Sequence, residues 1–272
     1  MKAFILFFLF IPLLFAQYNM KKLYVKSRTK TYKPLTQREY WSAVSLFKSL
    51  LKAPVLNETL SKEINQLHLE LVKLKKNTYA ITDTQREGGG FYIIRYKKVS
   101  KSMISIPHRF HDLKTGNIGY KLMRESSYRA AAFNTVHRKT MDAAHTEFTL
   151  FNAFHLAFAK TYPQESIYQL HGFSNTKRST LAAQDAHIIV SSSSRYLTAA
   201  AQKVYSCLNK ESGKCLLYGK NIFELGGTKN IQSMSLRDEG YRNFVHIELN
   251  SLMRDKLKKD AGLRARIAGC MP

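Results

Sequence analysis

Cysteine is scarce in this chain: there are three among 272 residues, and none stands in a CxxC pair. The Cys–His spacing of zinc fingers is missing too, which argues against a metal site built from cysteines. Cys207 and Cys215 lie on either side of a polar, glycine-containing stretch that is typical of a turn. We therefore expect these two to form a disulfide bond, with Cys270 left as the odd, free thiol.

The motifs of two common enzyme classes are also missing. The serine-rich stretch at 191–195 contains no GxSxG sequence, which argues against a serine hydrolase. The three glycines at 88–90 are followed neither by phosphate-loop spacing nor by a Lys-Ser/Thr pair, so nucleotide binding is not expected. There is no internal repeat, and the length suits one domain, alone or with a small extension.

Acidic residues are few: 19 Asp and Glu stand against 43 Lys and Arg, for a net charge of +24. So basic a protein favours polyanionic partners such as cell-wall polymers, acidic glycans, anionic lipid or nucleic acid. No nucleic-acid-binding module accompanies the charge, so specific nucleic-acid binding is not expected. A solubilising surface explains the charge equally well. The charge therefore predicts contact with an anionic polymer and nothing more specific.

An apolar run from Ala3 to Phe15 follows Lys2 at the start of the chain. It is too short for a comfortable membrane span and is typical of the core of a secretory signal peptide. We expect residues 1–16 to be a cleaved signal, with no stable transmembrane anchor, and the mature protein to be secreted or periplasmic. An uncleaved anchor is the alternative, because Leu14 is a bulky residue so close to the expected cleavage site.

Residues 17–82 are predicted to be a basic segment and a helical extension. A capping-box pattern opens the stretch 36–52, and apolar residues then recur at helical spacing. A second apolar stripe predicts a helix over 58–76. Neither helix carries residues that suggest chemistry.

Residues 83–272 are predicted to be an α/β domain, because strand-like and helix-like segments alternate along them. In such domains, ligands bind beyond the carboxyl ends of the strands. The expected strands are 91–96, 103–107, 131–137, 166–173, 186–192 and 243–250, and the expected helices are 115–130, 144–162, 197–208 and 251–268.

Three of the expected strands end in polar, metal-competent side chains. The stretches "SIPHRFHD", "IYQLHGF" and "FVHIELN" deliver His108, His171 and Glu248. Catalytic zinc takes three protein ligands and activates a water, and a nearby carboxylate then serves as the base. His108 with either His111 or Asp112 offers two ligands from one loop, His171 a third, and Glu248 the base.

Four motifs resemble, in order, a group of zinc amidohydrolases and carboxypeptidases: "SIPHRFHDLKTG", "HRKTMDAAHTEF", "YQLHGF" and "VHIELNSLMR". The group includes N-formylglutamate amidohydrolases, zinc carboxypeptidases and N-acetylmuramoyl-alanine amidases. The resemblance covers about residues 88–257. It implies a phosphorylase/hydrolase-like three-layer sandwich with a mixed central sheet, here with an N-terminal helical extension.

Carried over residue by residue, the resemblance implies His108 as the first zinc ligand, His171 as the late ligand and Glu248 as the catalytic glutamate. The chain departs from the group at the second ligand. Carboxypeptidases keep a glutamate three residues after the first histidine, but here His111 stands there and Asp112 follows. We favour Asp112 because its carboxylate matches the ligand type, with His111 as the alternative. Asp112 could instead cap the helix that follows.

The stretch "HRKTMDAAH" is a further polar cluster. Arg138 could bind a substrate carboxylate or stabilise an oxyanion. Asp142 and His145 could orient a metal ligand or the substrate. Alternatively, Asp142 caps the next helix. His137 is a less specific candidate in the same stretch.

Two further residues stand near the last expected strand. Arg254 follows Glu248 by six positions and suits an electrostatic partner for it, although a basic helix face explains Arg254 as well. His246 alternates with apolar residues, and we expect it to be packed rather than ligating.

These observations predict a secreted zinc-dependent hydrolase of amide or peptide bonds. The expected substrate is a peptide, an N-acyl amino acid or a cell-wall peptide, with acidic or cell-wall peptides favoured. The alternative is a non-catalytic binding protein of the same fold that holds an anionic cell-wall or glycan ligand. The departure at the second ligand motivates that alternative.

Overall fold

The computed structural model of the protein describes residues 19–52, 57–75, 77–97, 99–100 and 102–272. The expected signal peptide at residues 1–16 lies outside the described residues. Within the described part, no helix is both long enough and apolar enough to cross a membrane.

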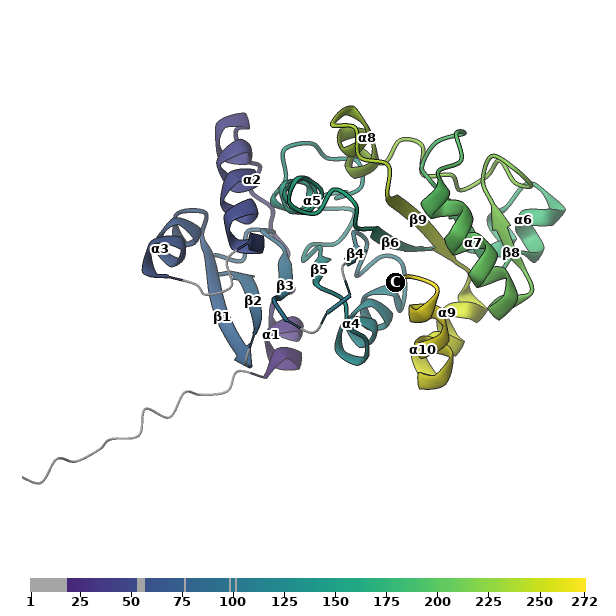
Figure 1. The fold of residues 1–272 in the computed structure, drawn as a ribbon, viewed down its shortest axis with the longest axis horizontal. Helices are drawn as coiled ribbons and strands as arrows, with labels where there is room; N and C mark the ends of the chain where they lie inside the picture. The colour runs from purple at the N-terminus through teal and green to yellow at the C-terminus, as the bar shows by residue number, and fades with distance from the viewer. Residues whose placement is uncertain (1–18, 53–56, 76, 98, 101) are drawn as a thin grey trace, which may run out of the picture.

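The described part of the chain forms one nine-stranded mixed sheet, in the order β1-β2-β3-β5-β4-β6-β9-β7-β8 (Figure 1). The central strands β5, β4, β6 and β9 run parallel. β3 and β7 run antiparallel to this centre on either side of it. The strands are β1 Leu69–Lys75, β2 Thr78–Asp83, β3 Phe91–Arg95, β4 Met103–Ile106, β5 Ala130–Phe133, β6 Ile167–Gly172, β7 Ile188–Ser191, β8 Cys215–Leu217 and β9 Phe244–Leu249.

Helices cover both faces of the sheet, which makes the three-layer α/β sandwich expected from the sequence (Figure 1). One face packs against α1 Met20–Lys26, α4 Thr115–Glu125, α7 Ala199–Ser212, α9 Ser251–Lys259 and α10 Ala261–Gly269. The other packs against α2 Gln37–Lys52, α3 Glu58–Gln66, α5 Leu150–Thr161 and α8 Ile231–Asp238. The short helix α6 Leu181–Asp185 and a 3₁₀ turn, Asn175–Lys177, follow β6.

The inner strands are buried on both faces. In β3, Phe91 and Ile93 pack into the core beneath α1 and α4, whereas Tyr92 and Ile94 pack into the core beneath α2 and α5. A strand covered on both sides needs apolar residues at every position. This explains why the predicted strands appear in the sequence as continuous apolar runs.

The predicted helix over 58–76 is wrong in its second half. The helix α3 ends at Gln66, and β1 begins at Leu69 and pairs antiparallel with β2. His68 between them has φ of 56°, which a continuing helix does not allow. The following "LELVKLK" buries Leu69, Val72 and Leu74 against the sheet, so tertiary burial overrides local helix preference. The segment expected to be helical therefore also supplies β1, one of the two edge strands of the sheet.

Other helix boundaries also differ from expectation: α4 ends at Glu125 rather than at 130, α7 spans Ala199–Ser212, and a third difference affects the candidate site. The phenylalanine-rich helix α5 begins at Leu150, where Thr149 accepts a hydrogen bond from the backbone N–H of Asn152 at 3.0 Å. Residues 144–149 are irregular, so Asp142 is not the N-cap of this helix. The single helix expected over 251–268 is broken at Asp260, which caps α10.

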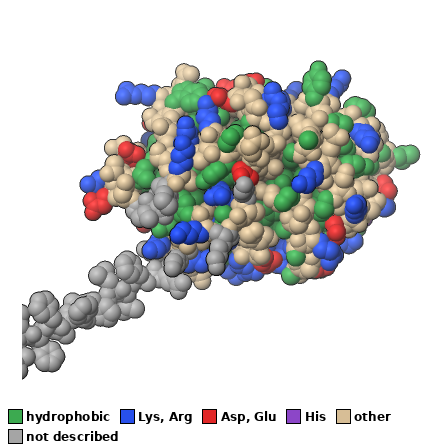
Figure 2. Space-filling view, viewed as in Figure 1, with side chains coloured by type: hydrophobic (Ala, Val, Ile, Leu, Met, Phe, Trp, Pro, Cys, Tyr) green, Lys and Arg blue, Asp and Glu red, His purple; other side chains and the backbone are tan. Residues whose placement is uncertain are grey.

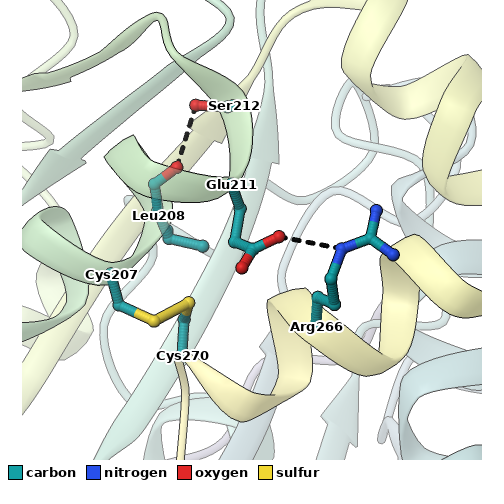
Figure 3. The surroundings of a disulfide bond; sticks show 6 residues. All are labelled: Cys207, Leu208, Glu211, Ser212, Arg266 and Cys270. Atoms are coloured by element: carbon teal, nitrogen blue, oxygen red, sulfur yellow. Dashed lines mark hydrogen bonds and ion pairs between the residues drawn. A yellow bond between two sulfur atoms is a disulfide. The ribbon is translucent and has the colours of Figure 1, made fainter.

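The expected disulfide is also wrong: Cys207 pairs with Cys270, and Cys215 is the free thiol (Figure 3). The Cα atoms of the bonded pair are 5.4 Å apart. Cys215 lies in β8 and is buried in the core, because its segment pairs with β7. Cys207, on α7, meets the end of α10, so the bond joins two helices that are distant in the sequence.

Removing this disulfide should destabilise the protein by up to about 4 kcal/mol, because the bond closes a loop with a sequence separation of 63. The measurement is denaturant unfolding of a Cys207→Ser/Cys270→Ser double variant beside the parent. A Cys215→Ala variant is the matched control for loss of a thiol without loss of a bond. Equal transition midpoints for the parent and the double variant would contradict the pairing.

A fully buried histidine should make stability depend on pH. His155 on α5 donates from Nδ1 to the carbonyl oxygen of Phe151 at 2.6 Å, and its Nε2 accepts from Ser105 Oγ at 2.7 Å. Burial lowers the pKa of His155 from 6.5 to about 4. Between these values the unfolded chain binds a proton that the folded chain does not, so acidification favours unfolding.

We expect this histidine to lower the free energy of unfolding by up to about 1.4 kcal/mol for each pH unit as the pH falls from 6.5 towards 4. The measurement is the unfolding free energy across this range for the parent and for His155→Gln. The variant should show a shallower slope, whatever its absolute stability. Identical slopes would contradict the prediction.

Candidate metal centre

The three polar strand ends predicted from the sequence meet at one edge of the sheet. β6 lies between β4 and β9 and runs parallel to both. His108 follows β4, His171 lies near the end of β6, and Glu248 lies beside it in register on β9. Parallel strands carry their carboxyl ends to the same edge, which is why residues so far apart in the sequence converge here.

His108, Asp112 and His171 form a buried group whose potential metal-binding atoms all lie within 4.8 Å of one another. Asp112 Oδ2 lies 3.3 Å from His108 Nδ1 and 3.5 Å from His171 Nδ1. The backbone N–H of Gly172 donates to the same carboxylate oxygen at 3.0 Å. The two imidazoles and the carboxylate thus face a common point.

A local turn explains why Asp112 reaches this point. The backbone N–H of Asp112 donates to the carbonyl oxygen of His108 at 2.9 Å, and one helical turn brings residues four apart onto the same side. His111 is exposed, and its ring centroid lies 6.4 Å from that of His108. Of the two second ligands suggested by the sequence, the structure therefore places Asp112 with the histidines.

Asp142 and Arg138 hold His108 from behind. His108 Nε2 donates to Asp142 Oδ1 at 2.8 Å, and Arg138 Nε donates to Asp142 Oδ2 at 2.8 Å. This leaves Nδ1 of His108 directed towards Asp112. Asp142 therefore orients a proposed metal ligand, one of the two roles that the sequence left open.

A buried amide network holds His171 in the same way. His171 Nε2 donates to Gln169 Oε1 at 2.8 Å, and Asn230 Nδ2 donates to the same oxygen at 2.6 Å. Gln169 Nε2 in turn donates to Ser105 Oγ at 3.2 Å. The sequence analysis missed Gln169. The available signal was its place two residues before His171, on the same face of the strand.

The pKa values of the group follow from burial and mutual pairing. Burial acts to lower the pKa of His108, but hydrogen bonds and charges from Asp112 and Asp142 outweigh it and raise the pKa to about 9. Burial and the nearby His246 lower the pKa of His171 to about 4. Burial acts to raise the pKa of Asp112, but its two histidine partners hold it well below the usual range. The carboxylate is therefore ionised and His171 neutral, as metal ligation requires, and a bound cation would displace the proton of His108.

Glu248 lies beside this group with one oxygen free. Its side chain is buried, and Oε1 accepts a hydrogen bond from His246 Nε2 at 3.3 Å. Glu248 Oε2 and His246 Nδ1 are buried and have no hydrogen-bond partner among the described residues. Such orphaned polar atoms call for a water or an ion nearby.

His246 contributes more to the site than the sequence suggested. We expected a packed side chain, and its ring is indeed buried, at 4.4 Å between centroids from the ring of His171. It also holds Glu248 by the hydrogen bond above and lines the hollow over the site. No sequence signal distinguishes it from a core histidine, because it alternates with apolar residues in a buried strand.

The remaining predicted residues lie at different distances from the metal group. Arg138 and His145 line the hollow over the metal group, and His145 contacts Asp142 through its backbone N–H at 2.9 Å. His137 lies beside His111, with ring centroids 5.5 Å apart, and its Nδ1 accepts from a backbone N–H of the adjacent turn.

Arg254 is buried beside the site, where it lines one of the hollows, and it is not paired with Glu248. Its guanidinium donates to the carbonyl oxygens of Phe173 and Leu249. Burial lowers the pKa of Arg254, while the charges of Asp112 and Glu248 act in the opposite direction. Within the described residues it makes no ion pair with either carboxylate, so it acts on both through space.

The donor set fits a zinc ion. Two imidazole nitrogens and one carboxylate oxygen are a set of three protein ligands that catalytic zinc sites use. Each histidine is held through its other ring nitrogen by a carboxylate or an amide oxygen, as ligating histidines usually are. Glu248, whose Oε2 has no partner among the described residues, lines the same two hollows as His108 and His171.

No family model and no curated protein matches the chain. Among solved structures it is similar to N-formylglutamate amidohydrolase from Ralstonia eutropha JMP134, with a TM-score of 0.48 and 10% identity over 68% of this chain and 96% of that chain. It is similar to a zinc-free structure named YNDL, with a TM-score of 0.42 and 14% identity over 64% of this chain and 84% of that chain. It is also similar to a metallo-carboxypeptidase from Burkholderia cenocepacia, with a TM-score of 0.39 and 7% identity over 88% of this chain and 69% of that chain. The amidohydrolase and the carboxypeptidase are of the kinds that the sequence motifs resemble.

Proposed function

We propose that this protein is a zinc-dependent hydrolase of amide or peptide bonds. One observation carries the proposal: a buried His108–Asp112–His171 group lies next to Glu248, whose second carboxylate oxygen has no partner in the described structure. Most buried acceptors in native proteins are hydrogen-bonded, so an unpartnered carboxylate oxygen beside such a group calls for a functional explanation. A catalytic site needs such an acceptor free for a proton.

In this proposal, some residues of the site bind the metal ion and another transfers the proton. His108, Asp112 and His171 would hold Zn²⁺, which supplies a water of lowered pKa and polarises the carbonyl to be attacked. Glu248 is the base that takes a proton and returns it to the leaving amine through its free Oε2. His246 fixes Oε1 of Glu248 and so keeps Oε2 directed into the site.

Arg138 is the group that we propose to meet negative charge on the substrate. Its Nε is bonded to Asp142, and its terminal nitrogens find no acceptor among the described residues. They are available to a substrate carboxylate or to the oxygen on which charge develops during attack. Arg138 also lines both hollows that adjoin the metal group.

The proposed substrates are acidic or cell-wall peptides outside the cytosol. The net charge of +24 supports an anionic substrate or surroundings. Lys and Arg side chains are spread over the face of the molecule in Figure 2 rather than gathered into one patch. The charge thus attracts anions generally, and specificity for the bond that is cleaved must come from the residues of the site.

Zinc content is the first test. Elemental analysis of the protein, purified without chelator or metal-affinity columns, should find about one zinc per chain, in line with a three-ligand site. A chelator should remove both the zinc and the amidase activity, and added zinc should restore both. A content near zero that stays unchanged after incubation with zinc would contradict the hydrolase and favour a binding protein of the same fold.

A further inference from the structure

Two hollows adjoin the metal group, and each is lined in part by residues that the other lacks. One has a volume of 410 Å³ and the other 520 Å³. The residues lining both are His108, Arg138, His171, Leu225 and Glu248. Because two of the proposed zinc ligands and the proposed base line both hollows, we treat the hollows as two arms of one cleft at the site.

The larger arm is rich in positive charge. Lys177 and Arg178, from the segment after β6, line it together with Arg254. Lys177 is exposed and makes no ion pair within the described part of the chain. Arg178 lies 4.0 Å from Glu224, too far for a tight pair. An acidic group that enters this arm could therefore pair with Lys177 without displacing an existing ion-pair partner.

The smaller arm has aromatic walls. Phe223 lines it with 65% of its surface exposed, beside Tyr218. Its floor passes Gly226 and Gly227, where a side chain would collide with Tyr218 and His246. A large exposed aromatic ring beside a functional cleft favours an apolar or flat group on the ligand. Lys229 is a cation that belongs to this arm and not to the other.

Leu225 contributes to the walls of both arms. Leu225, which lines both, has φ of 61°, a strained value for a residue other than glycine. Its neighbours hold it there: Glu224 accepts from the backbone N–H of Thr180 at 2.8 Å, and Ser191 Oγ donates to the carbonyl oxygen of Gly226 at 2.7 Å. These contacts tie both neighbours of Leu225 to other segments of the chain.

We propose that the cleft takes a chain that continues past the metal group in both directions, with an acidic unit in the Lys177 arm and an apolar or aromatic unit in the Phe223 arm. This rests on the proposed hydrolase function and deepens it, because such a substrate is cut at an internal amide bond. An enzyme that removes terminal units needs one arm closed around a chain end. Here exposed side chains, Leu113 and Phe223, stand at the two arms.

The test uses the zinc-loaded full chain and short peptides blocked at both ends, each with one phenylalanine and either one glutamate or its glutamine twin. Binding is measured by fluorescence polarisation with the Glu248→Gln variant, which holds the peptide without cutting it. Cleavage by the parent is located by mass spectrometry. The same sequences with free ends form the comparison set.

Three exposed side chains can be replaced to test how each arm contributes to peptide binding. Lys177→Met should weaken binding of the glutamate peptides about fivefold, the upper range for an exposed ion pair, and leave the glutamine twins unchanged. Phe223→Ala should weaken both sets about tenfold through lost apolar contact. Lys203→Met, which removes an exposed charge on α7 away from the cleft, is the matched control and should change neither set.

The outcomes separate this inference from the proposed function. Binding of blocked peptides with the Lys177 pattern, and internal cleavage by the parent, supports both. The same binding pattern with no cleavage of any peptide supports the two-armed cleft and overturns the hydrolase. The two-armed cleft is overturned if binding or cleavage needs a free chain end. It is also overturned if Lys177→Met weakens binding of the glutamate and glutamine peptides equally. Hydrolysis of the free-ended peptides would in either case leave the proposed hydrolase function intact.

Discussion

Replacing Glu248 by glutamine should lower the turnover number about 1000-fold while zinc stays bound. Glutamine has nearly the same shape, and its carbonyl oxygen can still accept the hydrogen bond from His246 Nε2 that Glu248 Oε1 accepts at 3.3 Å. The amide cannot take up a proton, however, so only the step that needs a base is lost. The measurement is kcat on a cleavable peptide beside zinc content by elemental analysis.

A surface glutamate gives the control for this substitution. Glu70 is exposed on β1 at the far edge of the sheet, so Glu70→Gln removes the same charge without touching the site. It should retain parental activity. Full activity in Glu248→Gln would remove Glu248 as the base. Loss of zinc together with activity would show that Glu248 supports metal binding instead.

Replacing Asp112 by alanine should weaken zinc binding by more than about 100-fold. Loss of a residue that only hydrogen-bonds to a metal ligand costs up to about 100-fold, and we expect loss of a ligand itself to cost more. Asp112 is the carboxylate that faces both Nδ1 atoms of the histidine pair, at 3.3 and 3.5 Å. Its removal also takes away the negative charge that offsets the cation. Competition titration against a chromogenic chelator measures the affinity directly and does not depend on activity.

His111→Ala is the matched variant for this experiment, because His111 is the other second ligand that the sequence allows. Its exposed ring lies away from the group, with its centroid 6.4 Å from that of His108. The variant should bind zinc as the parent does. If His111→Ala loses zinc and Asp112→Ala keeps it, the two assignments must be exchanged.

The strand ends could be predicted because they are a local property of the chain. His108, His171 and Glu248 each stand at or near the end of an apolar run, and in a sheet with a parallel centre such ends share one edge. The α/β fold itself was predictable for the same reason, since strand and helix patterns alternate. The structure confirms that fold class and places the three residues together.

Features that depend on contacts between distant segments were not predictable. Asp142 contacts His108 from a position 34 residues away, and only the late start of α5 shows that it is free to do so. Cys207 pairs across a separation of 63 residues because α7 and α10 are neighbours in space. Local spacing favoured the nearer Cys215, which β-pairing carries into the core.

By itself, the sequence determined the α/β architecture, the three polar strand ends and the chemistry available to them, because side-chain type and periodicity are encoded locally. Only the tertiary structure decided that Asp112 and not His111 faces the histidines, and that His246 holds Glu248. Those choices depend on which way a side chain points once a turn closes and a strand pairs. Two residues adjacent in the sequence, such as His111 and Asp112, can then face solvent and the buried site respectively.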